Sequence, residues 1–371
     1  MNNVEPSFWE LSAMVEFDIT IIGGGILGLF SALEIRKKYP NSHIAVFESG
    51  ILPQGATSRN AGFACFGSLT ELIANVGSMG EQETYNLVEK RWRGIQKLKR
   101  TFKDSEIDYY DLGGYELIFD SKNLEKEISQ MNEMLFPIFN KKIFALNNAK
   151  IKDFGFNKTN QLIENPLEGQ LHSGKLILAL NKKLREANIS YFSGAELTGY
   201  INLQDCLELE INHQKTFKTQ KLILTTNGFV PNSIRNVRPG RGQVLITNPI
   251  HDLQIKGCFH FDQGYYYFRN IENRILLGGG RQLDFEGETT SNFGLNDDIQ
   301  SDLIDKLKTI ILPHTEFEIF KQWSGIMAFE ENHKTVVQLI DRNVIYAMNC
   351  NGMGISLSPI TAEELINHIS C

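Results

Sequence analysis

A glycine-rich turn between an apolar run and a helical pattern is the feature that most constrains this chain. The run Ile19–Ile22 is short, β-branched and apolar, which indicates a buried strand. The spacing Gly23-x-Gly25-x-x-Gly28 then begins a helical pattern. A second apolar run follows and ends at Glu48. This order of strand, turn, helix, strand and acid is typical of a dinucleotide-binding unit.

Each part of the unit has a physical role. Gly23 permits the tight turn, Gly25 lets a pyrophosphate approach the backbone, and Gly28 lets the helix and the strand pack closely. The helix N-terminus supplies N–H groups and a partial positive charge for the phosphates. Glu48 stands where a carboxylate accepts hydrogen bonds from ribose hydroxyls. We expect the cofactor-binding residues of this segment to be Gly23, Gly25, Ile26, Leu27, Gly28, Glu48 and Ser49.

The bulk composition excludes several other classes of protein. The chain has 371 residues, of which 42% are hydrophobic and 22% charged, and this length allows two domains. The net charge of −7 argues against a nucleic-acid partner. The apolar run before the glycines is too short to cross a bilayer, so we expect no integral membrane segment.

The cysteines and the start of the chain indicate a compartment. The five cysteines are scattered and show neither metal-ligand spacing nor a disulfide pattern, so we expect no metal site. The first 14 residues lack the basic and apolar regions of a signal peptide. We therefore predict a cytoplasmic protein.

The stretch "GATSRNAGFACFGS", residues 55–68, follows the second strand and is rich in small and hydroxyl side chains. Such a loop can surround a phosphate and a ring. Here the sequence resembles the D-amino-acid oxidase/glycine oxidase (DAO) superfamily of FAD-dependent amine oxidases. In that family this loop runs along the pyrophosphate and reaches the flavin. The matching residues are Thr57, Ser58, Asn60, Ala61 and Gly62.

The resemblance extends along nearly the whole chain, through residues 221–232, 237–245, 265–284, 323–329 and 344–359. In the last segment a glycine loop begins a helix whose N-terminus could stabilise negative charge on the reduced flavin. No convincing residue for covalent attachment is present, so we predict non-covalent FAD. The resemblance implies further cofactor contacts at Leu197, Asn227, Gly228, Asn351, Gly352, Met353, Gly354 and Ile355.

The expected fold class is α/β, with two domains. A Rossmann-like, DAO-type FAD-binding domain is expected from residues 15–80, 145–235 and 335–371. A substrate domain with a mixed or antiparallel sheet is expected from residues 81–144 and 236–334. Within the latter, the apolar spacing predicts helices in "EQETYNLVEKRWRGIQKLKRTF", in "NLEKEISQMNEMLFPIF" and in "DDIQSDLIDKLKTIIL".

The resemblance implies that the chain oxidises a C–N bond of a small-molecule amine or amino acid by hydride transfer to flavin N5. Oxygen or another acceptor would then take the electrons. The segment "LLGGGRQ" is not followed by a helical pattern, so we expect no second, NAD(P)H-binding domain. Two alternatives stay open: an FAD-dependent 2-hydroxy-acid dehydrogenase, and a flavin-binding module without amine oxidase activity.

The substrate-side residues are chosen by chemistry. A substrate carboxylate needs a guanidinium that binds it through two parallel hydrogen bonds; Arg281 is the first candidate and Arg269 the second. Because side chains alternate along a strand, either Tyr266 alone or Tyr265 with Tyr267 would face the flavin. The catalytic candidates are Arg281, Tyr266, Tyr267 and Trp323.

Overall fold

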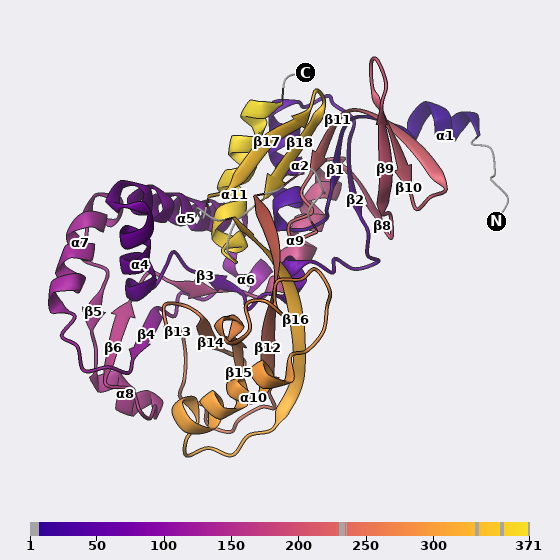
Figure 1. Cartoon of the computed structure of the whole chain (residues 1–371). Coiled ribbons are helices and arrows are strands. Elements are labelled where there is room, and N and C mark those ends of the chain that lie inside the picture. The colour runs from indigo at the N-terminus through magenta and orange to yellow at the C-terminus, as the bar shows by residue number, and fades with distance from the viewer. Residues whose placement is uncertain (1–6, 230–233, 235, 331–333, 349–351, 370–371) are drawn as a thin grey trace. The chain divides into compact units, whose positions relative to one another are not determined.

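The computed structural model describes residues 7–229, 234, 236–330, 334–348 and 352–369. The chain divides into two compact units (Figure 1). The first unit combines residues 1–58, 174–238 and 328–371, and the second combines residues 59–173 and 239–327. The prediction that particular ranges bind FAD and others bind the substrate concerns function, and it stays a prediction.

The first unit is built on a largely parallel sheet with the strand order β17-β18-β11-β1-β2-β8, extended by the β9–β10 hairpin beside β11. Its strands are β1 (Glu16–Ile22), β2 (Ile44–Glu48), β8 (Ser190–Ser193), β9 (Leu197–Asn202), β10 (Leu207–Ile211), β11 (Lys215–Leu224), β17 (Val336–Asp341) and β18 (Val344–Met348). Its helical segments are α1 (Phe8–Ala13), α2 (Ile26–Lys38), α3 (Ala56–Arg59), α9 (Ser173–Glu186), α11 (Gly354–Leu365) and η3 (Ile366–His368).

Strand β1 lies at the centre of this sheet. It pairs in parallel with β11 on one side and with β2 on the other. Residues 19–22 are all buried, as a parallel strand covered on both faces requires. Helix α2 follows directly, and α11 lies beside it (Figure 1). The predicted strand–turn–helix–strand unit is therefore confirmed as β1, α2 and β2.

The second unit is built on a mixed sheet with the order β16-β12-β15-β14-β13-β4-β6-β5. Its strands are β3 (Phe63–Ala64), β4 (Gly114–Ile118), β5 (Ala145–Leu146), β6 (Gln161–Asn165), β7 (Gly169–Gln170), β12 (Val237–Thr247), β13 (Cys258–Phe261), β14 (Tyr266–Ile271), β15 (Arg274–Gly279) and β16 (Ile319–Glu330). Its helical segments are α4 (Leu69–Met79), α5 (Glu81–Thr101), α6 (Asp104–Ile107), α7 (Glu125–Phe139), α8 (Ala149–Phe154), η1 (Arg281–Leu283), α10 (Asp297–Lys306) and η2 (Leu307–Ile311).

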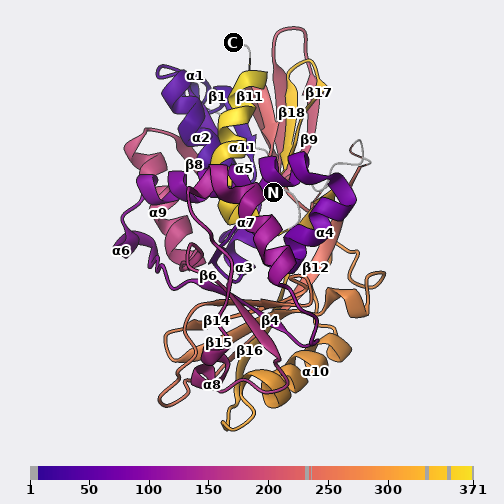
Figure 2. The same cartoon turned by 90° about the vertical axis from the view of Figure 1, so that its left-hand side faces the viewer.

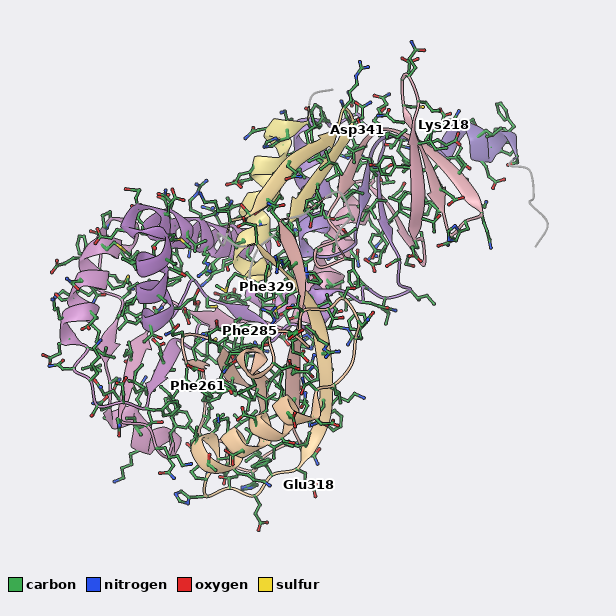
Figure 3. All side chains as sticks on the ribbon, in the orientation of Figure 1. Lys218, Phe261, Phe285, Glu318, Phe329 and Asp341 are labelled. Atoms are coloured by element: carbon green, nitrogen blue, oxygen red, sulfur yellow. The ribbon has the colours of Figure 1, made fainter. Side chains whose placement is uncertain are left out.

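Pairing in this sheet is mostly antiparallel, and β13 with β4 forms a parallel pair. Helix α10 lies against the sheet (Figure 2) and covers a core of stacked rings that includes Phe259, Phe261 and Phe268. Phe261 is labelled in Figure 3. Helices α4, α5 and α7 pack against one another. The expected α/β fold with a mixed, largely antiparallel second sheet is confirmed, as are the three helices predicted at α5, α7 and α10.

Candidate cofactor and substrate site

The turn between β1 and α2 contains glycines at positions where a side chain would meet the backbone. Gly23 has φ +111°, and a Cβ atom there would lie 2.7 Å from the Thr225 carbonyl oxygen. A Cβ atom on Gly28 would lie only 2.0 Å from the Gly23 carbonyl oxygen. The roles predicted for these two glycines, a tight turn and close packing, therefore correspond to contacts within the first unit.

Gly24 has a role that the sequence analysis did not assign. A Cβ atom at this position would lie 2.6 Å from the Tyr191 hydroxyl and 2.9 Å from Glu48 Cβ. The Glu48 carboxylate accepts a hydrogen bond from the Gly24 N–H at 2.8 Å and another from the Gly50 N–H at 3.1 Å. Glu48 is buried, at 7% exposure, and each of its carboxylate oxygens accepts one backbone N–H.

Tyr191, on β8, is a second residue that the sequence analysis missed. Burial and the nearby Glu48 carboxylate raise the pKa of Tyr191 to about 12. Its hydroxyl is buried and has no hydrogen-bond partner among the described residues. A hydroxyl of this kind beside a carboxylate fits the ribose of a dinucleotide, which both donates and accepts hydrogen bonds. The signal in the sequence would have been a tyrosine on the strand next to β2.

Two helix N-termini lie side by side in the first unit. Helix α2 begins after Gly25, which has no side chain to cap the helix. The Ile26 N–H instead donates to Thr57 Oγ1 at 3.0 Å. Helix α11 begins at Gly354, where a Cβ atom would lie 3.9 Å from Ile26 Cγ2. Each helix end carries a partial positive charge, so this place is suited to the anionic parts of a dinucleotide.

The loop after β2 is held by its own hydrogen bonds. Ser58, in the first unit, donates its hydroxyl proton to the Pro53 carbonyl at 2.6 Å. In the second unit, Asn60 Oδ1 accepts from the Gly62 N–H at 2.7 Å and from the Ser173 hydroxyl at 2.7 Å. Gly62 has φ +76°, which favours glycine in this turn.

The other predicted cofactor contacts lie in the first unit, except Ala61, which lies in the second. Leu197 begins β9 and packs against the core. Asn227 has φ +49°, Gly228 is buried, and Gly352 has φ +76°. Ser49 is exposed and Ala61 is buried. Asn351 lies outside the described residues. Met353 is the residue before α11, and Ile355 is buried in the first turn of that helix.

The two tyrosines chosen on β14 face opposite sides of the second sheet. Tyr266 stacks on Phe261 at 4.7 Å between ring centres and donates its hydroxyl proton to Asp302 of α10 at 2.7 Å. Tyr267 packs edge-on against Phe63 at 5.7 Å, in the same cluster as Ala61 and Trp323. Tyr267 and Trp323 thus share an apolar face with the predicted flavin loop, and Tyr266 does not.

The two candidate arginines have different surroundings. Arg269 is 3% exposed, and its Nη1 donates to the carbonyls of Gly62 at 3.0 Å and Leu171 at 2.9 Å. Burial lowers the pKa of Arg269 to about 10. Its guanidinium therefore holds the loop that follows Asn60.

Arg281 lies elsewhere in the second unit, with its guanidinium 5.2 Å from the Phe285 ring centre (Phe285 is labelled in Figure 3). It donates to the Thr289 hydroxyl at 3.2 Å. Burial lowers the pKa of Arg281. Arg269 is thus engaged by two carbonyls, and the assignment of Arg281 to a substrate carboxylate stays a prediction.

The chain is similar to several known proteins. The family model described as DAO, FAD dependent oxidoreductase, matches residues 18–368. Gamma-glutamylputrescine oxidoreductase of Escherichia coli (strain K12) is 22% identical, over 97% of this chain and 85% of that protein. The crystal structure of L-proline dehydrogenase from P. horikoshii has a TM-score of 0.77 at 17% identity, covering 96% of this chain and 94% of that chain. The crystal structure of glycine oxidase from Geobacillus kaustophilus has a TM-score of 0.73 at 17% identity, covering 96% of each chain.

Among the helices of the described residues, none combines the length and the apolar character needed to span a lipid bilayer. The family match covers nearly all of the chain and agrees with the glycine turn, the paired helix N-termini and the two sheets described above. The chain therefore belongs to the DAO family of FAD-dependent oxidoreductases.

Proposed function

We propose that this enzyme oxidises a C–N bond of a small amine or amino acid, using FAD that is bound without a covalent link. When bound, the flavin supplies the oxidising chemistry by accepting a hydride at N5 from the carbon next to the nitrogen. The observation that carries the proposal is the apolar face of the second unit, where Tyr267 and Trp323 pack in one cluster with Ala61 of the predicted flavin loop.

We assign roles in substrate binding to residues of this face and to Arg281. Tyr267 and Phe63 meet edge to face at 5.7 Å and present an apolar wall. The Trp323 indole donates its N–H to the Arg59 carbonyl at 3.0 Å, which fixes the ring orientation. Rigid aromatic rings of this kind orient a small substrate and exclude water. Arg281 is the cation that we assign to a substrate carboxylate.

The names of similar proteins agree with this substrate class. The relatives and solved structures described above carry the names gamma-glutamylputrescine oxidoreductase, L-proline dehydrogenase and glycine oxidase. Each name refers to an amine or amino acid. Oxygen or another carrier stays our prediction for the electron acceptor, and a cytoplasmic location stays a prediction from the sequence.

An anaerobic screen tests the proposal directly. The purified yellow protein is mixed with glycine, sarcosine, D-amino acids, proline, polyamine derivatives and 2-hydroxy acids, and bleaching of the flavin absorbance is followed. We expect bleaching by an amine or amino acid, and ammonia or an amine as a product after air is admitted. Bleaching by hydroxy acids alone would favour the 2-hydroxy-acid dehydrogenase. A flavin that no compound bleaches would favour a flavin-binding module.

A further inference from the structure

Three metal-ligand side chains from distant parts of the chain meet in the interior of the second unit. They are Cys65, Glu168 and His260, and all three are buried. Their ligand atoms lie within 4.8 Å of one another. We propose that these three residues form a zinc-binding site, separate from the candidate cofactor site.

The backbone fixes all three ligands. Strands β3 and β7 are antiparallel, with Ala64 opposite Gly169. Cys65 and Glu168 come next on these two chain segments, so the ladder holds them near each other. His260 lies within β13, between β14 and β4. Ligands carried by paired strands are already ordered, which lowers the entropy cost of binding an ion.

The imidazole of His260 has one nitrogen without a hydrogen-bond partner among the described residues. This nitrogen is Nε2, and the residue is 9% exposed. The nearest carboxylate oxygen, Glu168 Oε2, lies 3.6 Å away, slightly beyond hydrogen-bond range. Since buried polar nitrogens nearly always have a partner, a ligand for this nitrogen is expected.

The carboxylate of Glu168 is accommodated by a glycine. A Cβ atom on Gly114 would lie 2.1 Å from Glu168 Oε2, so any larger residue would push the carboxylate away. The other contact of this carboxylate is weak, since Glu168 Oε1 accepts from the Phe66 N–H at 3.4 Å. A buried carboxylate with so few donors is costly unless a cation compensates its charge.

Carboxyl groups and one guanidinium lie near the cluster. Glu116 stands opposite His260 on β4 and accepts hydrogen bonds from the side chains of Ser68 and Thr70. The Arg91 guanidinium lies 2.8 Å from the Glu71 carboxylate. Arg91 therefore already has a partner, and burial raises the pKa of Glu116, so His260 or a bound cation is left to compensate Glu168.

A divalent cation changes the state of the thiol. Without one, burial and the Glu168 carboxylate keep the pKa of Cys65 well above its usual range, so the sulfur stays protonated. When zinc binds, the S–H bond breaks, the proton leaves to bulk water and the sulfur lone pair binds the metal. No electrons are exchanged, because zinc is redox-inert.

The ligand set selects zinc among common metals. A thiolate, an imidazole and a carboxylate match the donors that zinc prefers, whereas magnesium and calcium prefer oxygen donors alone. Metal–ligand distances of about 2.0–2.3 Å place two tetrahedral ligands roughly 3.3–3.8 Å apart. The separation of 3.6 Å between His260 Nε2 and Glu168 Oε2 falls in this range. A water molecule would take the fourth position. Cys258 donates its thiol proton to the Gly169 carbonyl at 3.2 Å and is not needed for the site.

Such an ion would stabilise the apolar face described above. The His260 ring lies 5.2 Å from the Phe63 ring, and His260 stands opposite Tyr267 in the β13–β14 ladder. Cys65 lies directly after β3, which continues the loop from Asn60 to Gly62. Zinc bound here would therefore join three chain segments and hold the aromatic wall in place.

The full-length chain, expressed with zinc in the medium and desalted, tests the site by elemental analysis and by X-ray absorption at the zinc edge. We expect about one zinc ion per chain and a sulfur scatterer at about 2.3 Å. The Cys65→Ser and His260→Gln variants should lose at least about tenfold in zinc content, because each removes one of three protein ligands. Cys206→Ser, which changes a cysteine of the first unit, should keep the full content.

Any of three results would overturn the site. The first is a wild-type chain that carries no zinc after expression with zinc and incubation with zinc alone. The second is an absorption spectrum that shows only nitrogen and oxygen neighbours. The third is zinc that persists in both ligand variants. The X-ray absorption measurement uses the wild-type chain, so it decides the question even where a variant fails to fold.

Discussion

The Glu48 carboxylate accepts a hydrogen bond from the Gly24 N–H at 2.8 Å, and this bond joins the end of β2 to the glycine turn after β1. The acid at the end of the second strand therefore has a structural task besides the ribose contact expected from the sequence. The same carboxylate accepts a second bond, from the Gly50 N–H, at 3.1 Å.

Replacing this acid should weaken FAD binding. In Glu48→Gln one carboxylate oxygen becomes an NH₂ group. The amide therefore keeps one accepting oxygen for the two backbone N–H groups, and one hydrogen bond is lost. Losing a hydrogen bond to a charged group costs about 1.5–3 kcal/mol. We expect the Kd for FAD, measured by quenching of flavin fluorescence, to rise about tenfold to a hundredfold. Glu16→Gln, an exposed acid at the start of β1, is the matched control and should leave the Kd unchanged.

A methyl group on Gly28 should disrupt the turn. Its Cβ would lie 2.0 Å from the Gly23 carbonyl oxygen, so the strand and the helix would have to separate. Overpacking of this kind costs about 1–3 kcal/mol or more. We expect Gly28→Ala to lower the free energy of unfolding in urea by that amount and to lose FAD.

The control for this substitution lies in α4. A Cβ atom on Gly77 meets nothing within 4 Å, and Gly77 is inside the helix. Gly77→Ala should therefore stabilise the protein by about 0.5–1 kcal/mol. A Gly28→Ala protein as stable as the wild type would show that the turn is looser than the contacts described here.

The two arginines should give opposite phenotypes. Arg269→Met removes the donor shared by the Gly62 and Leu171 carbonyls. The Gly62 carbonyl still accepts the Leu171 N–H at 2.8 Å, whereas the buried Leu171 carbonyl loses the guanidinium. Because an unsatisfied buried carbonyl costs about 1–3 kcal/mol, we expect a clear loss of stability. Arg281→Met should keep the stability and instead raise the KM for substrates that carry a carboxylate.

Urea unfolding and steady-state kinetics on both variants make this comparison. If Arg281→Met left the KM of every carboxylate substrate unchanged, the assignment of Arg281 to the substrate would be wrong. The pair is informative because both variants remove a guanidinium from the same unit.

Tyr266→Phe and Tyr267→Phe form a matched pair of neighbours. Tyr266→Phe removes a hydrogen bond to Asp302 and should cost about 1 kcal/mol of stability with little effect on kcat/KM. Tyr267→Phe removes a hydroxyl from the face that includes Ala61 and should lower kcat/KM for the substrate that the bleaching screen identifies. Kinetic loss in Tyr266→Phe alone would reverse the assignment of the two faces.

The Tyr267 hydroxyl also predicts a pH dependence. Burial raises the pKa of Tyr267 to about 12, above the ordinary phenol value of about 10. The unfolded chain therefore loses this proton first, and the stability that Tyr267 contributes is present below pH 10 and declines as the pH rises towards 12. The free energy of unfolding is measured in urea from pH 9 to pH 11 for the wild type and for Tyr267→Phe. As the pH rises, the value for the wild type should fall relative to the value for the variant. A constant difference would contradict the raised pKa of the Tyr267 hydroxyl.

The local part of this protein follows from its sequence. The glycine spacing, the apolar runs and Glu48 lie within one short segment, so their geometry depends on neighbours in the chain, and β1, α2 and β2 were predicted at those places. The helices at α5, α7 and α10 were likewise predictable, because an amphipathic helix repeats its apolar side chains with the period of its own backbone.

Strand alternation puts Tyr266 and Tyr267 on opposite faces of β14, and only tertiary packing determines what each face contacts, because α10 covers the face of Tyr266 and places Asp302 against its hydroxyl. The hydrogen bonds from Arg269 to the Gly62 and Leu171 carbonyls likewise depend on tertiary packing. The meeting of Cys65, Glu168 and His260 depends on the pairing of strands far apart in the sequence, and no local spacing encodes it. Side-chain contacts across a sheet depend on register, and register is a property of the folded chain.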